Sequence, residues 1–295
     1  MFLKSIVEKM EKYHKIWKSK PIKELLNFSF INLDKPSGPT SFQVSDYVRN
    51  LFGLNKTSHF GTLDPKVSGV LPIAMGRACR LNDYLMHKNK TYVGIMKLHE
   101  NLDQVKLKEV IKDFMGKINQ MPPVKSKVRR AIREREIVSF DIIEIEDKDV
   151  LFKTEVQAGT YIRKLIHDIG EKIGGAHMLE LRRTRAGFFD EGNSDFLNLY
   201  DLEKAFDEYK SGDEKKLRKI LIPAEESILK VMPAIQVKEE AVKKLLMGKP
   251  LMKDDLSSEI IDAKIFAVFC EDKLIEICKG VEEGDIVGRA LFVLN

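Results

Sequence analysis

Ser58-His59-Phe60-Gly61-Thr62-Leu63-Asp64-Pro65-Lys66-Val67-Ser68-Gly69-Val70-Leu71-Pro72 is the stretch around which the rest of the chain is organised. It places one carboxylate, Asp64, among glycines, prolines and apolar residues, a composition that disfavours a helix and favours a rigid loop. Asp64-Pro65 alone is typical of a turn, because an Asp side chain accepts local backbone N–H groups and proline fixes the next φ. The stretch therefore predicts an ordered loop that presents Asp64 as the candidate catalytic centre.

The totals of the chain predict one large domain with a smaller one. The 295 residues exceed the size at which one core usually keeps growing, and 43% of them are hydrophobic. The formal net charge is only +5, so the protein is no general polycation. A nucleic-acid partner would need the positive charge to be gathered on one face.

Cysteine usage and hydropathy favour a cytoplasmic protein. Cys79, Cys270 and Cys278 are odd in number and form no C-x-x-C, which indicates neither a disulfide framework nor a zinc site. No apolar run approaches the roughly 20 residues that cross a bilayer, so we expect no membrane partner. The amino terminus lacks the apolar core of a secretion signal and the early arginines of an import signal.

The first half of the chain alternates between strand and helix patterns. Residues 1–27 are charged, carry the only tryptophan, Trp17, and predict a helical extension, for which a solvated leader is the plainer alternative. Residues 28–33 predict a strand that enters a turn, and Thr40 or Ser41 is a suitable cap for the helix that follows. Further along we expect a strand at 92–98, a helix at 104–115 and a hairpin formed by 137–145 and 150–156.

The second half predicts a helix, a strand and a separate small β domain. Apolar residues from Ile162 to Ile173 recur at helical spacing until Gly174-Gly175, and a strand follows at 177–189. Helices continue to about residue 230, so the irregular order favours a mixed α/β (α+β) sheet over repeated βαβ units. After Met232-Pro233, a short helix and several short strands rich in turn residues predict a small β-barrel.

Three further motifs accompany the Asp64 loop in a fixed order. They are 33–41 (LDKPSGPTS), 90–92 (KTY) and 159–170 (GTYIRKLIHDIG). Together the four stretches resemble the TruB and dyskerin family of RNA pseudouridine synthases over most of the chain. The resemblance implies a pseudouridine synthase fold, with a mainly antiparallel central sheet flanked by helices. It also implies a division into an extension (1–27), a catalytic domain (28–232) and a PUA-like RNA-binding barrel (233–295).

The implied reaction detaches uracil from its ribose at N1, turns the base and rejoins it through C5. No cofactor and no metal are needed, and the chain contains neither G-x-G-x-x-G nor a P-loop. Asp64 would act at the sugar, by attack on C1′ or by taking a proton from C2′. The resemblance assigns its ion-pair partner to Arg163 and base stacking to Tyr92, in a pocket closed to solvent.

Four other residues match substrate-binding positions of the family. Tyr161 and Leu181 would line an apolar wall beside the base, which excludes water. His59 would help to turn the target nucleotide out of its stack, although Phe60 follows it where the family usually has a small residue. Lys35 would support the active-site loop, its alternative being a turn lysine in water.

Positive charge is concentrated after Pro122-Pro123. Six of the twelve residues from Lys125 to Glu136 are Lys or Arg and two are acidic. Charge runs are usually solvated faces, but here they would neutralise RNA phosphates without reading sequence. The predicted phosphate-binding residues are Lys125, Lys127, Arg129, Arg130 and Arg133, joined by Arg182 and Arg183.

Only residues 124–136 separate Pro123 from the hairpin, whereas bacterial members carry a longer insertion there. The chain thus resembles the archaeal branch, which works with an H/ACA guide RNA and small accessory proteins. We expect guide-directed isomerisation of uridines in rRNA. Two alternatives stay open: a stand-alone synthase for the tRNA T-loop, and a non-catalytic RNA-binding scaffold.

Overall fold

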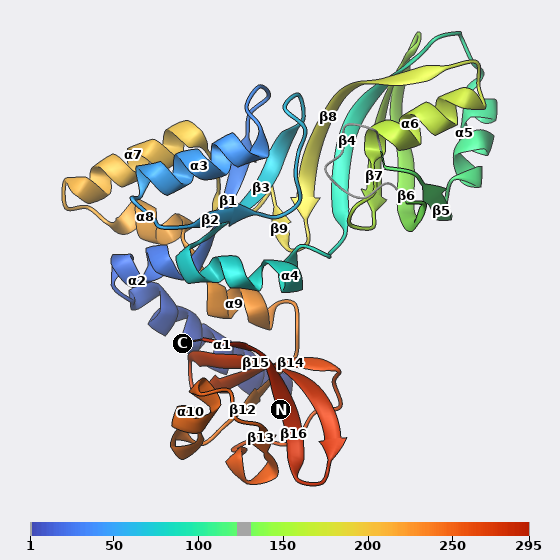
Figure 1. The fold of residues 1–295 in the computed structure, drawn as a ribbon. Helices are drawn as coiled ribbons and strands as arrows, with labels where there is room; N and C mark the ends of the chain where they lie inside the picture. The colour runs from blue at the N-terminus through green and yellow to red at the C-terminus, as the bar shows by residue number, and fades with distance from the viewer. Residues whose placement is uncertain (1, 123–130, 295) are drawn as a thin grey trace.

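The computed structural model describes residues 2–122 and 131–294. Its larger part is built on an eleven-stranded sheet of order β10-β1-β3-β8-β4-β7-β6-β5, with β11 on β1, β2 on β3 and β9 on β8 (Figure 1). Among the described strands of this sheet, only β1 with β10 and β3 with β8 pair in parallel, so the predicted mixed, mainly antiparallel sheet is confirmed. The strands are β1 (Ser29–Lys35), β2 (Thr57–His59), β3 (Ser68–Met75), β4 (Lys90–Leu98), β5 (Gly116–Gln120), β6 (Arg133–Glu146), β7 (Asp149–Val156), β8 (Ala176–Ala186), β9 (Phe189–Asp190), β10 (Phe196–Asn198) and β11 (Ile222–Pro223).

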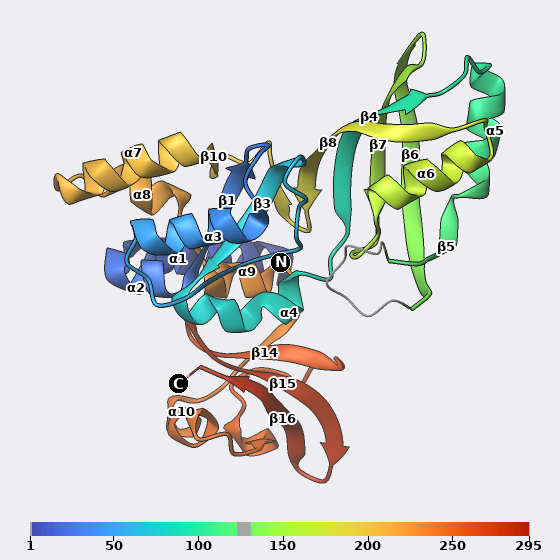
Figure 2. The ribbon, with the colours of Figure 1, turned by 45° about the horizontal axis from the view of Figure 1, so that its top comes forward.

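The helices cover this sheet in two groups (Figures 1 and 2). One group lies against β1 and β3, and the other, α5 and α6, lies against β4, β7 and β6. The predicted cap of α3 is confirmed. The Thr40 hydroxyl accepts a hydrogen bond from Gln43 N at 3.1 Å, and Gln43 Oε1 accepts one from Thr40 N. The helices are α2 (Ile22–Asn27), α3 (Ser41–Leu51), α4 (Asn82–Leu85), α5 (Gln104–Asp113), α6 (Ile162–Glu171), α7 (Leu199–Lys210), α8 (Lys215–Ile220) and α9 (Ala224–Leu229), with a 3₁₀ turn at Gly76–Leu81. No helix in the described ranges is long and apolar enough to cross a bilayer.

Strand β8 joins the two halves of the sheet. It pairs with β4 along most of its length, and with β3 only where Ser68 meets Arg182 and Gly69 meets Arg183. Gly69 has φ +103°, and a Cβ there would lie 2.1 Å from the Arg183 carbonyl oxygen. Only glycine permits this approach, because both the backbone angle and the space exclude a side chain. The contact places the loop before β3 directly beside β8.

A second, five-stranded sheet of order β12-β14-β15-β16-β13 forms the carboxyl-terminal part. An isolated bridge between Val237 and Leu256 links the segments that follow the two outer strands, so the sheet curls towards the predicted barrel. All three cysteines are free thiols, as predicted. The elements are β12 (Ala234–Gln236), α10 (Glu239–Leu246), β13 (Leu251–Met252), a 3₁₀ turn at Lys253–Asp255, β14 (Ile265–Cys270), β15 (Lys273–Glu283) and β16 (Ile286–Val293).

Helix α1 (Phe2–Ser19) packs on this small sheet rather than extending into solvent (Figure 1). Trp17 is 0% exposed, and its Nε1 donates to the Asp272 carbonyl oxygen at 2.6 Å. Lys18 Nζ donates to the Leu221 carbonyl oxygen at 2.6 Å, so the helix also contacts the segment between α8 and β11. The expected helical extension is therefore confirmed, and the alternative of a solvated leader is wrong for the part that carries Trp17.

Glu276 is an unusual feature of the small sheet, because its side chain is buried without a cation. Its Oε1 accepts a hydrogen bond from Cys278 Sγ at 3.2 Å, and its Oε2 has no partner among the described residues. Burial raises the pKa of Glu276 to about 7; the thiol opposes the shift and Asp255 adds to it. The carboxyl group thus costs folding free energy once it ionises.

Glu276→Gln is expected to stabilise the protein above pH 7. The folded state raises this pKa from 4.5 to about 7, so it holds the proton more tightly than the unfolded chain. Wild-type stability should therefore fall as pH rises through that window, by on the order of 3 kcal/mol, and the amide removes this loss. Thermal unfolding of both proteins from pH 5 to 8 measures the effect. The exposed Glu240→Gln is the control, and a variant-minus-wild-type difference that is constant with pH contradicts the prediction.

Candidate active site

Asp64 occupies the first position of a tight turn between β2 and β3. Its carbonyl oxygen accepts from Val67 N at 2.9 Å, so the predicted Asp-Pro turn is present. Ser41 fixes the residue before it, because its hydroxyl donates to Leu63 O at 3.0 Å and accepts from Leu63 N at 2.8 Å. The turn is thus held by the start of α3, and no local pattern indicates this role of Ser41.

Arg163 meets Asp64 across the site. Its Nη2 lies 3.1 Å from Asp64 Oδ2, and it stands on the first turn of α6. The start of α6 is fixed by Gln120 on β5, whose Oε1 accepts from Tyr161 N at 3.0 Å and whose Nε2 donates to Tyr161 O at 3.3 Å. The structure therefore brings together the two residues predicted to form the central ion pair. Gln120 was missed, because nothing local links it to a residue 41 positions away.

The expectation of a closed pocket around this pair is wrong for the protein alone. The Asp64 side chain is 56% exposed and that of Arg163 is 62% exposed. The physical reason lies in the turn, whose neighbouring residues Thr62, Pro65 and Lys66 are also exposed, so the carboxylate projects from the sheet into solvent. An exposed pair contributes little to stability, so its geometry matters for chemistry rather than for folding.

Lys35 lies beneath the turn and is fully buried. Its Nζ donates to the carbonyl oxygens of Pro36, Pro65 and Val67 at 2.8, 3.0 and 2.8 Å. Burial lowers the pKa of Lys35, and the Asp64 carboxylate opposes that shift. Lys35 therefore supports the loop from inside, and both a turn lysine in water and direct contact with a substrate are excluded by its burial.

The arginines of β8 make internal contacts, which corrects their predicted role at RNA phosphates. Arg183 is 1% exposed and donates to the carbonyl oxygens of Gly61 and Val70, on either side of Asp64, so no phosphate reaches it. Arg182 is committed to carboxylates, with Nη2 3.0 Å from Asp34 Oδ2 and Nε 2.9 Å from Glu191 Oε2. The partners of both arginines come from segments that β8 lies between or beside in the sheet, which the sequence pattern of β8 alone does not report.

Tyr92 lies on β4 and is 9% exposed, with Arg183 as its register partner on β8. Leu181, half-buried, pairs with Gly94 two residues further along β4, where a Cβ would lie 2.9 Å from the Leu181 side chain. Tyr161, also half-buried, precedes α6. These three predicted base-contacting residues therefore come from adjacent elements of the half of the sheet that α6 covers.

His59 is half-buried, and its Nε2 lies 3.4 Å from Thr62 Oγ1. Burial lowers the pKa of His59 and the charge of Arg183 acts in the same direction, so a neutral imidazole is favoured at neutral pH. Phe60 does not crowd it, because its ring is buried against Phe30 and Phe189 with centroids 5.2 and 5.8 Å away. Phe60, the larger residue at this position of the motif, therefore packs in the hydrophobic core.

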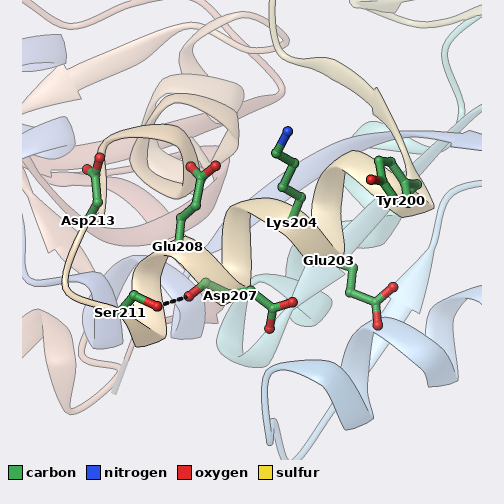
Figure 3. Close-up of a pocket in the computed structure, with 7 residues that line it drawn as sticks. All are labelled: Tyr200, Glu203, Lys204, Asp207, Glu208, Ser211 and Asp213. Atoms are coloured by element: carbon green, nitrogen blue, oxygen red, sulfur yellow. Dashed lines mark hydrogen bonds between the residues drawn. The ribbon is translucent and has the colours of Figure 1, made fainter.

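Of the predicted phosphate-binding stretch, Arg133 begins β6, next to Gln120 on β5. The remaining four residues, Lys125, Lys127, Arg129 and Arg130, lie outside the described residues. A concave surface elsewhere does not belong to the site: it follows α7, and its acidic side chains would repel phosphates (Figure 3). It is lined by Tyr200, Glu203, Lys204, Asp207, Glu208, Ser211 and Asp213.

The arrangement suits chemistry at a sugar carbon. An exposed carboxylate faces a guanidinium, on a turn that buried Lys35 and Arg183 hold by its carbonyl oxygens. In the described parts of the chain, no three His, Cys, Asp or Glu side chains are placed to hold a metal ion. The site therefore offers a fixed anion with an adjacent cation.

Comparisons with known proteins identify the families that the chain resembles. Residues 49–162 match the family described as TruB family pseudouridylate synthase (N terminal domain). Residues 163–229 match the tRNA pseudouridylate synthase B C-terminal domain, and residues 11–45 match the DKCLD (NUC011) domain. A probable tRNA pseudouridine synthase B of Methanopyrus kandleri is 42% identical over 297 residues, covering 100% of this chain and 81% of the relative. That of Nanoarchaeum equitans is 44% identical over 253 residues, covering 85% and 72%.

Two solved structures have closely similar folds. A chain in the crystal structure of a Cbf5-Nop10-Gar1 complex superposes with a TM-score of 0.85 at 37% identity, covering 94% of this chain and 88% of that one. A chain in the structure of an H/ACA RNP bound to a substrate RNA containing 2′-deoxyuridine has a TM-score of 0.84 at 35% identity, covering 95% and 89%. The similarity therefore extends over both sheets.

Proposed function

The chain belongs to the TruB family of pseudouridylate synthases, and we propose that it is the catalytic subunit of an archaeal-type H/ACA guide ribonucleoprotein. In this role it isomerises selected uridines of rRNA to pseudouridine. The guide RNA selects the uridine by base pairing, and the protein supplies the chemistry. Family membership alone identifies neither the substrate RNA nor the assembly, and both are part of what we propose.

The observation that carries the chemical part is the contact of Asp64 Oδ2 with Arg163 Nη2 at 3.1 Å. The carboxylate acts on the ribose, at C1′ as a nucleophile or at C2′ as a base, while the N1 to C1′ bond breaks. Arg163 holds the carboxylate beside its guanidinium through this ion pair. The detached uracil turns against the Tyr92 ring and bonds to C1′ through C5, which displaces Asp64 from C1′ or, in the base route, is accompanied by return of the proton to C2′. The C5 proton is then lost and N1 takes up a proton, so that the product is an isomer of the substrate.

The exposure of the ion pair supports an enzyme whose site is completed by RNA. With Asp64 56% exposed, the protein alone does not exclude water from a detached base. A flipped uridine held in a guide–substrate duplex would cover the carboxylate and stack on the half-buried walls formed by Tyr161 and Leu181. We infer that RNA closes the pocket that was expected in the folded chain.

Two further findings support the guide-directed branch and its partners. The match of residues 11–45 to the DKCLD domain accompanies structural similarity to chains solved in H/ACA complexes. We therefore expect small proteins of the Nop10 and Gar1 kind to bind this chain. In the same proposal the carboxyl-terminal sheet acts as the PUA-like domain (233–295), which holds guide RNA beside the catalytic domain (28–232).

Guide dependence is the experiment that tests the assembly. Purified protein is given a guide-targeted rRNA fragment or a tRNA T-arm transcript, each with and without guide RNA and accessory proteins. Tritium release from C5 of the target uridine reports conversion. We expect the rRNA fragment to be converted only when its guide is present, whereas conversion of the T-arm alone, with none of the guided fragment, contradicts the proposal.

The second candidate is a stand-alone synthase for the tRNA T-loop, which the names of the relatives in M. kandleri and N. equitans favour. The reactions with the T-arm transcript in the same assay distinguish this candidate from the guide-directed enzyme. A non-catalytic RNA-binding scaffold is a third candidate, and it predicts RNA binding without conversion of either substrate.

A further inference from the structure

Arg183 is a buried cation whose hydrogen bonds surround the Asp64 loop. Its Nε donates to Val70 O at 2.7 Å, beyond the loop, and its Nη2 donates to Phe60 O at 3.2 Å, before the loop. Both Nη atoms lie 3.1 Å from Gly61 O. One planar guanidinium thus fixes the two ends of the segment that presents the carboxylate, a fork geometry that lysine cannot reproduce.

The same guanidinium reaches the residue predicted to stack on the base. Tyr92 is the register partner of Arg183, so the two side chains point to the same face of the sheet from adjacent positions on β4 and β8. Arg183 therefore bonds the segment that carries the carboxylate and is the cross-strand neighbour of the aromatic residue.

The residues around Arg183 indicate that burying its guanidinium costs folding free energy. Lys90 is buried beside Arg183, and burial together with the Arg183 charge lowers the pKa of Lys90 to about 8. Two neighbouring buried cations are unfavourable for folding unless their donors are satisfied. Here the donors are used on backbone carbonyl oxygens, with Lys90 Nζ bonded to the carbonyl oxygens of Met86 and Lys88.

We propose that Arg183 is a positioning residue for the isomerisation: it sets the distance between the Asp64 carboxylate and the Tyr92 ring, and so between the ribose and the turning base. The inference rests on the proposed function. It assigns Arg183 no contact with RNA, in agreement with its 1% exposure. We expect the loss of the Arg183 guanidinium to slow the chemical step and to leave substrate binding unchanged.

Arg183→Lys keeps the charge and removes the fork. We expect the single-turnover rate constant on saturating substrate to fall by about 10- to 100-fold, as for a displacement of reacting groups by up to 1 Å. The dissociation constant for the same RNA should stay within about threefold, because binding contacts are untouched. Arg218→Lys is the matched control, since Arg218 also bonds carbonyl oxygens, those of Lys18 and Lys20, away from the site. It should keep the wild-type rate.

A second pair of variants tests the contact from the loop side and keeps the buried arginine. In Gly61→Ala the new Cβ lies 3.3 Å from Arg183 Nη1, whereas in Gly53→Ala it meets nothing within 4 Å, and the two φ angles are alike at +69° and +63°. Backbone strain is therefore matched, and only Gly61→Ala should slow single turnover, by about 3- to 10-fold.

Wild-type rates in folded Arg183→Lys, or equal rates in the two alanine variants, overturn the inference. The inference also fails if the Arg183→Lys rate is reduced near the melting temperature of the variant but equals the wild-type rate well below it. Such a pattern would indicate that Arg183 only stabilises the fold. The proposed function fails separately, if the wild-type protein converts no uridine.

Discussion

Asp64→Asn is expected to abolish pseudouridine formation, with a fall of at least about 10⁴-fold in the single-turnover rate constant, the scale seen when a unit of catalytic residues loses one member. The amide keeps the shape of the side chain and can still accept from Arg163, but it carries no negative charge to attack C1′ or to take a proton from C2′. RNA affinity should change by less than about 1 kcal/mol, because the turn is held by Lys35 and Ser41 rather than by the carboxylate.

The measurement is tritium release from the target uridine together with RNA binding by the same variant. Asp46→Asn is a matched control, because Asp46 also forms an arginine pair, with Arg49 Nη2 at 2.7 Å, but on α3. It should keep wild-type turnover. Full turnover by Asp64→Asn would reduce Asp64 to a turn residue and leave the protein as the scaffold of the third candidate or as an enzyme with another centre.

Trp17→Ala should be the most destabilising single change outside the site, at about 3–5 kcal/mol. The ring is 0% exposed and packs with Tyr13, at a centroid distance of 5.7 Å, where α1 meets the small sheet. The substitution also leaves the Asp272 carbonyl oxygen without its indole donor.

Thermal and denaturant unfolding measure this loss, with Tyr200→Ala as the control. Tyr200 is 72% exposed, so its removal should change stability by no more than about 0.5 kcal/mol. A loss below about 1 kcal/mol in Trp17→Ala would mean that α1 contributes little to holding the small sheet in place.

Local patterns were sufficient for most of the fold. The alternation in 137–145 and 150–156 became β6 and β7, and the helical spacing from Ile162 became α6 with Ile162, Leu165, Ile166 and Ile169 buried. Such patterns report which face of an element is apolar, which is a local property. They do not report which strands become neighbours, so the order β3-β8-β4 could not be predicted from them.

That missing order explains the errors at the site. Arg183 was expected at phosphates as part of a basic cluster, but β8 lies between β3 and β4, where the Arg183 side chain is buried. The closed pocket was expected from the needs of the chemistry, whereas Asp64 lies on a turn whose neighbouring residues are themselves exposed. The Asp64–Arg163 contact was predicted from motifs of the family, since a separation of about a hundred residues gives no local signal.

The bond from Trp17 to Asp272 has a consequence for biosynthesis, because the two residues are 255 positions apart. A ribosome that adds about 5–20 residues per second takes roughly 13–50 s to make the partner of a helix that emerges first. During that interval the indole of the nascent chain has no small sheet to cover it, and a transcript cut short before β15 never provides one. Such a truncated product would display the Trp17 face to chaperones and proteases even though its catalytic motifs are complete.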